Sequence, residues 1–318
     1  KLKLTVFVLL LCLLLNLAGC AAAQKPLRVT LVLKTVTEVA EFWGTLLSGV
    51  EKAAEEYGVE LKVLTSPREI DIDKQIELIR QVTADKPDVM ILSAADYDRC
   101  AEATEEAIAA GIGVVAIDTD VNAAGRACFV GSNSYEIGLE MGRAMASYLP
   151  EGGKVAVIQH MLTTTTGIER TRGVLDALNE AGNIEILGSF CCDNSTEQAQ
   201  TITTELLSAD PEIRGFVCTN EVCNVGAANA LVELGMGGRV YVVGCDNSQR
   251  QIQFLEQNII QAIVIQRPFN MGYMAVQQAV RVANGEQTDD FVEVSCVLIT
   301  RENMYTQENQ KLLFPVLR

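Results

Sequence analysis

The chain is poor in histidine, with one His among 318 residues, and it carries 25 Lys and Arg against 41 Asp and Glu. A single His excludes a metal site built from several His ligands and weighs against a His-based catalytic triad. The formal charge of -16 opposes binding to nucleic acid or to an anionic membrane surface, because both repel a polyanion. We therefore predict no metal, no cofactor, no catalytic residues and no nucleic-acid partner.

Several motifs that carry chemistry are also missing. The ten cysteines contain no Cys-x-x-Cys pair, and the glycines at 152–153 and 235–238 match neither a phosphate-binding loop nor Gly-x-Gly-x-x-Gly. Several cysteines stand in apolar, strand-like runs, where a free thiol behaves as a small buried hydrophobe. We predict structural thiols, with redox or metal chemistry at Cys191 and Cys192 as the alternative.

The N-terminal segment is predicted to lie outside the fold. Two lysines precede an apolar run over residues 5–15, and an Ala-Gly pair leads to Cys20. This is the pattern of a secretory signal peptide, and the run is too short for a transmembrane helix. The small pair before a cysteine resembles a bacterial lipobox, which implies a signal peptide over 1–19 and a lipid on the Cys20 thiol. Residues 20–26 would then form a lipidated tether; the alternative is a buried or uncleaved hydrophobic helix.

From residue 28 onward, short apolar runs alternate with longer amphipathic ones. The predicted strands cover 28–34, 60–64, 89–93, 114–118, 154–159, 185–190, 215–219, 239–246, 261–266 and 291–300, and the predicted helices cover 45–57, 72–84, 100–110, 135–149, 167–181, 196–208, 225–234, 250–258 and 271–284. Strands that stay apolar without alternation indicate a sheet covered on both faces, and strand-helix repetition indicates parallel order. The strands are too many for one ordinary open sheet. We predict an α/β fold of two doubly wound parallel-sheet lobes with a cleft between them.

Polar residues stand where the apolar strands end, and ligands of such sheets bind beyond the carboxyl ends of the strands. They are Lys34, Asp118, Asn220, Asp246 and Gln266. Carboxylates and carboxamides can bond two neighbouring hydroxyls at once, and an aromatic ring covers the apolar face of a sugar. Phe42 and Trp43, in the predicted loop after the first strand, supply such rings. The pattern favours a neutral polyol ligand; the alternative is that each polar residue caps a helix or forms a turn.

Short segments recur in an order and spacing typical of one family. They are Val32-Leu33-Lys34-Thr35 with Phe42-Trp43, Thr65-Ser66-Pro67, Ile117-Asp118-Thr119-Asp120, Glu169-Arg170-Thr171-Arg172-Gly173, Thr219-Asn220-Glu221, Val243-Gly244-Cys245-Asp246 and Gln266-Arg267-Pro268. Over about residues 27–305 the chain resembles the type I periplasmic binding proteins of sugar ABC transporters, in the ribose- and D-allose-binding group.

The resemblance implies roles for individual residues. Sugar hydroxyls would be bonded by Asp118, Arg170, Asn220, Asp246 and Gln266, with Trp43 and Phe42 stacking on the ring. Asn194 falls near a position where the group often has another aromatic, and the common Asp-Arg pair reads Asp118-Thr119. Arg170 has an alternative role as a solvated first-turn residue, although the helix dipole disfavours a cation there. His160 is expected to be structural.

The resemblance also implies the domain organisation. Three strands would join the lobes, with crossings near 131–133, 266–268 and 294–296. The N-terminal lobe would comprise 27–131 plus 267–294, and the C-terminal lobe would comprise 132–266 plus 295–318.

We therefore predict a monomeric, lipid-anchored extracytoplasmic protein that captures a monosaccharide and delivers it to an ABC transporter permease. A non-sugar ligand, such as a furanosyl signal molecule, nucleoside or polyol, is the alternative within the same fold. A transcriptional regulator would need a basic helix-turn-helix at the N-terminus, where the lipobox stands. A glycoside hydrolase would need two opposed carboxylates, for which Asp118 and Asp246 are the candidates.

Replacing Cys20 with Ser tests the anchor. Because the lipid would be carried by the Cys20 thiol, we expect the variant to accumulate as unprocessed or released protein. Fractionation of cells into membrane and soluble protein measures this. A variant as fully processed and membrane-bound as the parent would contradict the lipobox interpretation.

Overall fold

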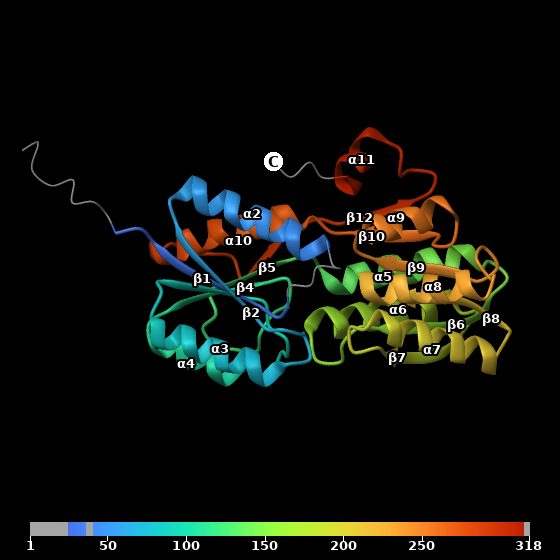
Figure 1. Ribbon diagram of the computed structural model, residues 1–318, viewed down its shortest axis with the longest axis horizontal. Helices are drawn as coiled ribbons and strands as arrows, with labels where there is room; N and C mark the ends of the chain where they lie inside the picture. The colour runs from blue at the N-terminus through green and yellow to red at the C-terminus, as the bar shows by residue number, and fades with distance from the viewer. Residues whose placement is uncertain (1–24, 36–40, 315–318) are drawn as a thin grey trace, which may run out of the picture.

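The computed structural model describes residues 25–35 and 41–314, which form two lobes placed end to end (Figure 1). Each lobe is a six-stranded sheet with helices on both faces. The predicted fold class is thereby confirmed. The predicted signal peptide (1–19), Cys20 and most of the predicted tether lie outside the described residues. Within the described part, no helix is both long and apolar enough to cross a membrane.

The first lobe follows the predicted alternation of strands and helices. Its elements are β1 (Arg28–Leu33), α2 (Glu41–Tyr57), β2 (Glu60–Thr65), α3 (Ile72–Asp85), β3 (Val89–Leu92), α4 (Ala101–Ala109), β4 (Gly113–Ile117), β5 (Cys128–Gly131), α10 (Pro268–Ala283) and β11 (Phe291–Glu293). The strands are all parallel, in the order β11-β5-β4-β3-β1-β2. Leu31 and Leu33 pack with α2 and α10, whereas Val32 packs on the opposite face with α3 and α4. Both faces of β1 are buried, which explains its unbroken apolar sequence.

The second lobe repeats this architecture. Its elements are α5 (Ser134–Tyr148), β6 (Gly153–Gln159), α6 (Thr165–Ala181), β7 (Ile184–Cys191), α7 (Thr196–Ala209), β8 (Ile213–Cys218), α8 (Glu221–Glu233), β9 (Tyr241–Cys245), α9 (Gln249–Glu256), β10 (Ala262–Ile265), β12 (Val297–Thr300) and α11 (Gln307–Leu313). The strand order is β12-β10-β9-β8-β6-β7, and β12 alone runs antiparallel to its neighbour. Helices α5 and α6 cover one face, and α7, α8 and α9 cover the other.

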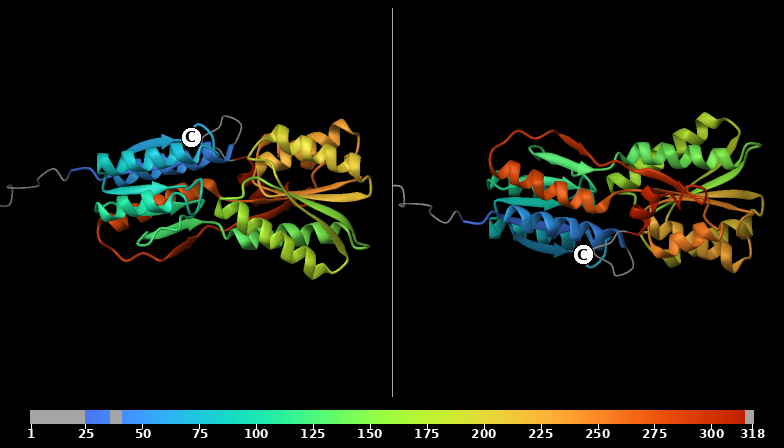
Figure 2. Two further views of the ribbon diagram at one scale, coloured as in Figure 1. Left: turned by 90° about the horizontal axis from the view of Figure 1, so that it is seen from below. Right: turned by 90° about the horizontal axis from the view of Figure 1, so that it is seen from above.

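The chain passes between the lobes in three places (Figure 2). These connections run from β5 to α5, from β10 to α10 and from β11 to β12. In each lobe, the carboxyl ends of the parallel strands face the other lobe. The loops that follow the strands of both sheets therefore meet between the lobes. The Tyr97 amide, for example, donates to the Thr163 carbonyl at 2.9 Å, and these residues follow β3 and β6.

Several local predictions were wrong. Helix α8 begins at Glu221, four residues before its predicted start at residue 225. Helix α2 begins at Glu41, four residues before the predicted start, so Phe42 and Trp43 lie in its first turn rather than in a loop. The predicted strand 291–300 is two short strands in different sheets, because the chain leaves one lobe after Glu293 and enters the other at Val297. Strand β5 and helix α11 were not predicted; with 4 and 7 residues, they are too short to carry a clear periodicity.

Helices α5 and α6 approach each other closely because glycines face the contact. A Cβ atom at Gly138 would overlap the Arg170 carbonyl oxygen, and one at Gly173 would overlap the Tyr135 carbonyl oxygen. Both obstacles are backbone atoms, which cannot move aside without shifting a helix. The glycines thus set the position of α6, the helix that carries Arg170.

We expect Gly138→Ala to lower the free energy of unfolding by about 1–3 kcal/mol, because the added methyl group forces the two helices apart. Gly44→Ala is the matched control, since Gly44 is exposed in α2 and a Cβ there meets no atom within 4 Å. The control should be slightly more stable than the parent, by about 0.5–1 kcal/mol. Urea unfolding of both variants measures the difference, and equal stabilities would contradict the packing argument.

Candidate functional site

A cavity lies between the lobes, at the carboxyl ends of both sheets. Its lining consists of Lys34, Phe42, Trp43, Glu69, Asp118, His160, Thr166, Arg170, Asn194, Asn220, Glu221, Val222, Asp246 and Gln266. All nine side chains predicted to bind ligand are in this set, so the fold brings them together. The cavity leaves about 50 Å³ for the centres of water-sized atoms, and a lobe movement would change this volume.

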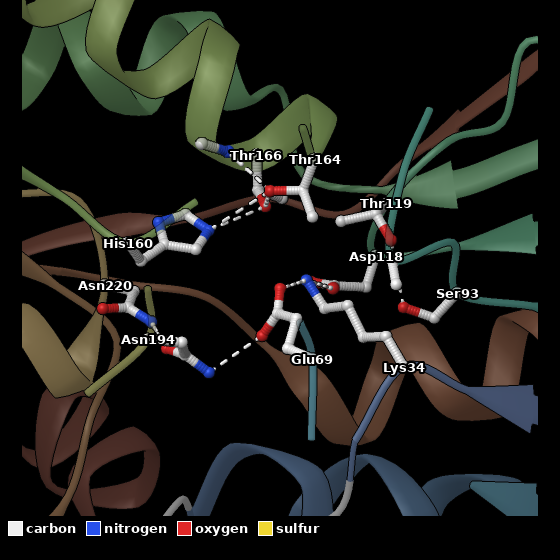
Figure 3. Close-up of polar contacts among 12 residues, drawn as sticks. Lys34, Glu69, Ser93, Asp118, Thr119, His160, Thr164, Thr166, Asn194 and Asn220 are labelled. Carbon is white, nitrogen blue, oxygen red and sulfur yellow. Dashed lines mark hydrogen bonds and ion pairs between the residues drawn. The ribbon is translucent and has the colours of Figure 1, made fainter. Parts of the chain in front are cut away.

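The first lobe contributes a buried cation between two carboxylates (Figure 3). The Lys34 ammonium lies 2.8 Å from Glu69 Oε1 and 3.4 Å from Asp118 Oδ2, and all three side chains are at most 6% exposed. Burial opposes the charge on Lys34, but the two carboxylates outweigh it and raise the pKa of the lysine above its ordinary value. Lys34 is therefore held charged at the edge of the cavity.

The Asp118-Thr119 pair shows how this chain departs from the family pattern. Thr119 does not line the cavity: its hydroxyl donates to the Ala94 carbonyl at 2.7 Å and shares a hydrogen bond of 3.1 Å with Ser93. The cation beside Asp118 comes from Lys34 at the end of β1 instead of from the next residue along the chain.

The second lobe places Arg170 and Asp246 on the opposite wall. Arg170 is 2% exposed, which excludes the alternative of a solvated helix residue. Its Nη1 donates to the Thr219 carbonyl at 2.8 Å and lies 3.6 Å from Asp246 Oδ2. Asp246 also accepts from Gln266 Nε2 at 2.6 Å and from the Glu221 amide at 3.3 Å. These contacts orient the Asp246 carboxylate while leaving it at the cavity wall.

The capping alternative is excluded for Asp246 and holds in part for Asn220. Helix α9 is capped by Ser248, whose hydroxyl accepts from the Gln251 amide, so Asp246 is not its cap. Asn220 does cap α8, because its side chain accepts from the Cys223 amide at 3.0 Å. Its Nδ2 meanwhile donates to Asn194 Oδ1 at 2.8 Å, so one carboxamide serves both the helix and the site.

The backbone is in the left-handed region at both strand-end aspartates. The φ angles are 62° at Asp118 and 69° at Asp246. This conformation is uncommon for residues other than glycine and costs free energy, and such residues concentrate at ligand-binding sites. Each lobe thus turns an aspartate out of its sheet in the same way, which points both carboxylates into the space between the lobes.

Side-chain hydrogen bonds already link the two lobes. Asn194 Nδ2 donates to Glu69 Oε2 at 2.9 Å, which extends the Lys34 cluster across the cavity to Asn220 (Figure 3). The backbone N–H of Gln249, at the start of α9, donates to Oε1 of Glu41, at the start of α2, at 3.1 Å. The lobes are therefore in a closed arrangement.

Five lining residues were not assigned to the ligand from the sequence: Glu69, His160, Thr166, Glu221 and Val222. Glu69 follows an edge strand, β2, whose side chains are half-buried or exposed, so nothing in the sequence distinguishes it from a surface glutamate. Glu221 stands directly after Asn220, and this adjacency was the available signal.

His160 is a hydrogen-bonded part of the cavity wall. Its Nδ1 lies 2.8 Å from Thr219 Oγ1, and its Nε2 lies 3.2 Å from Thr166 Oγ1. Burial, together with the cations Lys34 and Arg170, lowers the pKa of the imidazole well below its ordinary value. The ring is neutral at physiological pH and joins the polar network without adding charge.

The described residues provide no metal centre: no group of three or more His, Cys, Asp or Glu side chains among them is placed to hold an ion. The eight cysteines of this part of the chain are free thiols, and six of them are buried. The sulfur atoms of Cys192 and Cys223 lie 3.4 Å apart.

Comparison with known proteins identifies the family. The model of the periplasmic binding protein domain matches residues 30–287, so the chain belongs to the periplasmic binding protein family. This is a family of solute-binding proteins, which confirms the prediction that the chain is not an enzyme.

Two curated relatives span nearly the whole chain. The D-ribose/D-allose-binding protein of Pseudomonas aeruginosa is 26% identical over 289 residues, covering 87% of this chain and 89% of its own. The D-allose-binding periplasmic protein of Escherichia coli is 25% identical over 303 residues, covering 91% and 96%. A carbohydrate transporter solute-binding protein from Agrobacterium radiobacter, crystallised with D-arabinose, shares the fold with a TM-score of 0.87, at 23% identity over 91% of this chain and 99% of its own.

We expect Lys34→Met to lower the free energy of unfolding by about 3–5 kcal/mol, because it leaves Glu69 and Asp118 buried without a cation. Glu69→Gln in the Lys34→Met background should recover part of this loss, since it removes one of the unpaired charges. The control is Lys52→Met, which breaks the exposed ion pair with Glu55 and should leave stability unchanged within error. Urea unfolding measures all three, and a Lys34→Met effect no larger than the control would contradict the buried-cluster argument.

Proposed function

We propose that this protein captures a monosaccharide in the cavity between its lobes and delivers it to an ABC importer. The proposal rests on the residues that line the cavity. Planar carboxylates and carboxamides come from both lobes, and two aromatic rings lie beside them. Trp43 is 6% exposed, and Phe42 meets it edge to face with ring centroids 5.1 Å apart. The names of the Pseudomonas and Escherichia coli relatives support a sugar as the ligand.

Ligand capture would work by lobe closure. Asp118 stands on one lobe, and Arg170, Asn220 and Asp246 stand on the other. Sugar hydroxyls that form hydrogen bonds with residues of both lobes would have all their partners only when the lobes are closed. A ligand shifts the equilibrium between open and closed lobes only through contacts it gains in one of them. The direct bond from Asn194 to Glu69 would add to this preference for closure.

The proposal includes a place in the cell. We propose an extracytoplasmic protein, tethered through a lipid on Cys20, that acts as a monomer beside its permease. The signal-like and lipobox-like pattern before residue 21 supports this, and the Cys20→Ser experiment tests it.

One observation favours a larger ligand, such as a nucleoside, for a binding protein of this fold. A second cavity of about 650 Å³ adjoins the site on the side of α2, α10 and α11, and shares Phe42, Asp246 and Gln266 with it. Its walls include apolar groups such as Phe269 and Leu312. A base attached to a sugar ring would find both room and an apolar surface there.

Titration calorimetry of D-ribose, D-allose, a polyol and a nucleoside tests the function, and Asp246→Asn tests the site. Asparagine keeps the size and one acceptor of Asp246 but loses the charge-assisted bonds to sugar hydroxyls. We expect an affinity at least about tenfold weaker. The ligand-free thermal midpoint should also fall, because the buried Arg170 guanidinium loses its carboxylate partner. Asp176→Asn, at an exposed position of α6, is the control and should bind like the parent. Absence of binding to every compound would overturn the proposed function, and unchanged affinity with a lowered midpoint would assign Asp246 to structure.

A further inference from the structure

Glu221 has a buried carboxyl oxygen with no partner. It is the first residue of α8, is 5% exposed and lines the cavity between Asn220 and Val222. Within the described residues, its Oε2 has no hydrogen-bond partner, although the atom is inaccessible to solvent. Buried polar atoms are almost always paired, because an unpaired one costs about 1–3 kcal/mol. A lone carboxyl oxygen on the wall of a ligand cavity therefore indicates a partner that arrives with the ligand.

The charges around Glu221 decide its protonation. Lys34 and Arg170, the cations of the cavity, are engaged with Glu69, Asp118, Asp246 and the Thr219 carbonyl. Two cations thus face three carboxylates before Glu221 is counted. An ionised Glu221 would add a fourth negative charge to a dry cavity, and among the described residues it has no ion-pair partner, unlike Glu69, Asp118 and Asp246.

Most of the groups that face Glu221 from neighbouring elements also favour its protonated form. Burial contributes most to raising the pKa of Glu221, followed by the charge of Asp246 after β9 and, more weakly, that of Glu41 on α2. The Ser248 hydroxyl, before α9, partly offsets them. The resulting pKa is about 8, so the carboxyl group is mainly protonated at pH 7. His160, after β6, is neutral and adds no charge.

Resting on the proposed function, we propose that Glu221 is a further ligand-binding residue that acts as a neutral acid, its carboxyl O–H donating a hydrogen bond to an oxygen of an uncharged sugar. The geometry separates the roles of adjacent groups. Asp246 accepts from sugar hydroxyls, while Glu221, whose amide donates to Asp246 at 3.3 Å, offers a donor beside it. A sugar with an acceptor next to a donor hydroxyl matches this pair. Sugar acids and sugar phosphates would meet the excess of carboxylates and be rejected.

Binding should consequently weaken as the pH rises. Only the protonated carboxyl group binds, so the apparent Kd is the intrinsic Kd divided by the protonated fraction. With a pKa of about 8, that fraction falls from nearly all at pH 6 to about a tenth at pH 9. We expect the Kd for D-allose or D-ribose, whichever binds more tightly, to rise about tenfold between pH 6 and pH 9. Lys34 does not titrate in this range, because its pKa is raised above its ordinary 10.5.

Glu221→Gln assigns the titrating group. The amide keeps the size and a permanent donor, so its Kd at pH 6 should stay within about threefold of the parent and should not change up to pH 9. This distinguishes Glu221 from the Cys192 thiol, whose pKa is lowered by its hydrogen bond with Cys223. Glu233→Gln, at the exposed other end of α8, is the matched control and should keep the pH dependence of the parent.

The outcomes separate the two proposals. If the parent binds the sugar with the same Kd from pH 6 to pH 9, the inference on Glu221 is overturned while the proposed function stands. If no compound of the panel binds at any pH, the proposed function fails, and the inference fails with it.

Discussion

Each lobe buries a cation at the carboxyl end of its sheet, and the geometry of the cleft depends on how those cations are compensated. Desolvating a charge is costly, so a buried cation persists only where anions and hydrogen-bond acceptors surround it. Lys34 has Glu69 and Asp118, and Arg170 has Asp246 and a backbone carbonyl. Because the pairs constrain one another, the carboxylates are already oriented before a ligand arrives. Among the described acids that line the cavity, Glu221 differs from Glu69, Asp118 and Asp246 in having no ion pair.

This arrangement requires unusual backbone geometry in both lobes. Asp118 and Asp246 reach the cleft through left-handed conformations, and Arg170 reaches it because α6 lies unusually close to α5 at Gly138 and Gly173. These features lie in covered parallel sheets and packed helices, whose rigidity holds the strain. In the proposed lobe closure, the three connections between the lobes would move while the half-sites on each lobe keep their shape.

A large share of this protein could be predicted from the sequence, since the relevant signals are local. Alternating apolar and amphipathic runs indicated the strands and helices, and the polar residues after strands, Asp118 and Asp246 among them, indicated the site. Parallel strands explain this success, because the residue after each strand necessarily falls at one edge of the sheet. The errors came where the local signal is weak. Phe42 lies in a helix whose first turn has no apolar periodicity of its own, and residues 291–300 are extended in two lobes with a crossing between them.

The sequence by itself determined the covered sheets, the doubled architecture and the set of planar and aromatic residues, because burial pattern and residue chemistry are properties of short segments. Only the tertiary structure decided which of those residues share one cavity and in what charge state. Nothing in the sequence distinguishes Glu69 from a surface glutamate until folding sets it against Lys34. Glu221, which precedes the predicted helix over 225–234, has no assigned role until folding buries it beside Asp246. Both outcomes depend on charges contributed by segments far apart in the chain, and electrostatic energy follows distance in space and local dielectric, neither of which is set by spacing along the sequence.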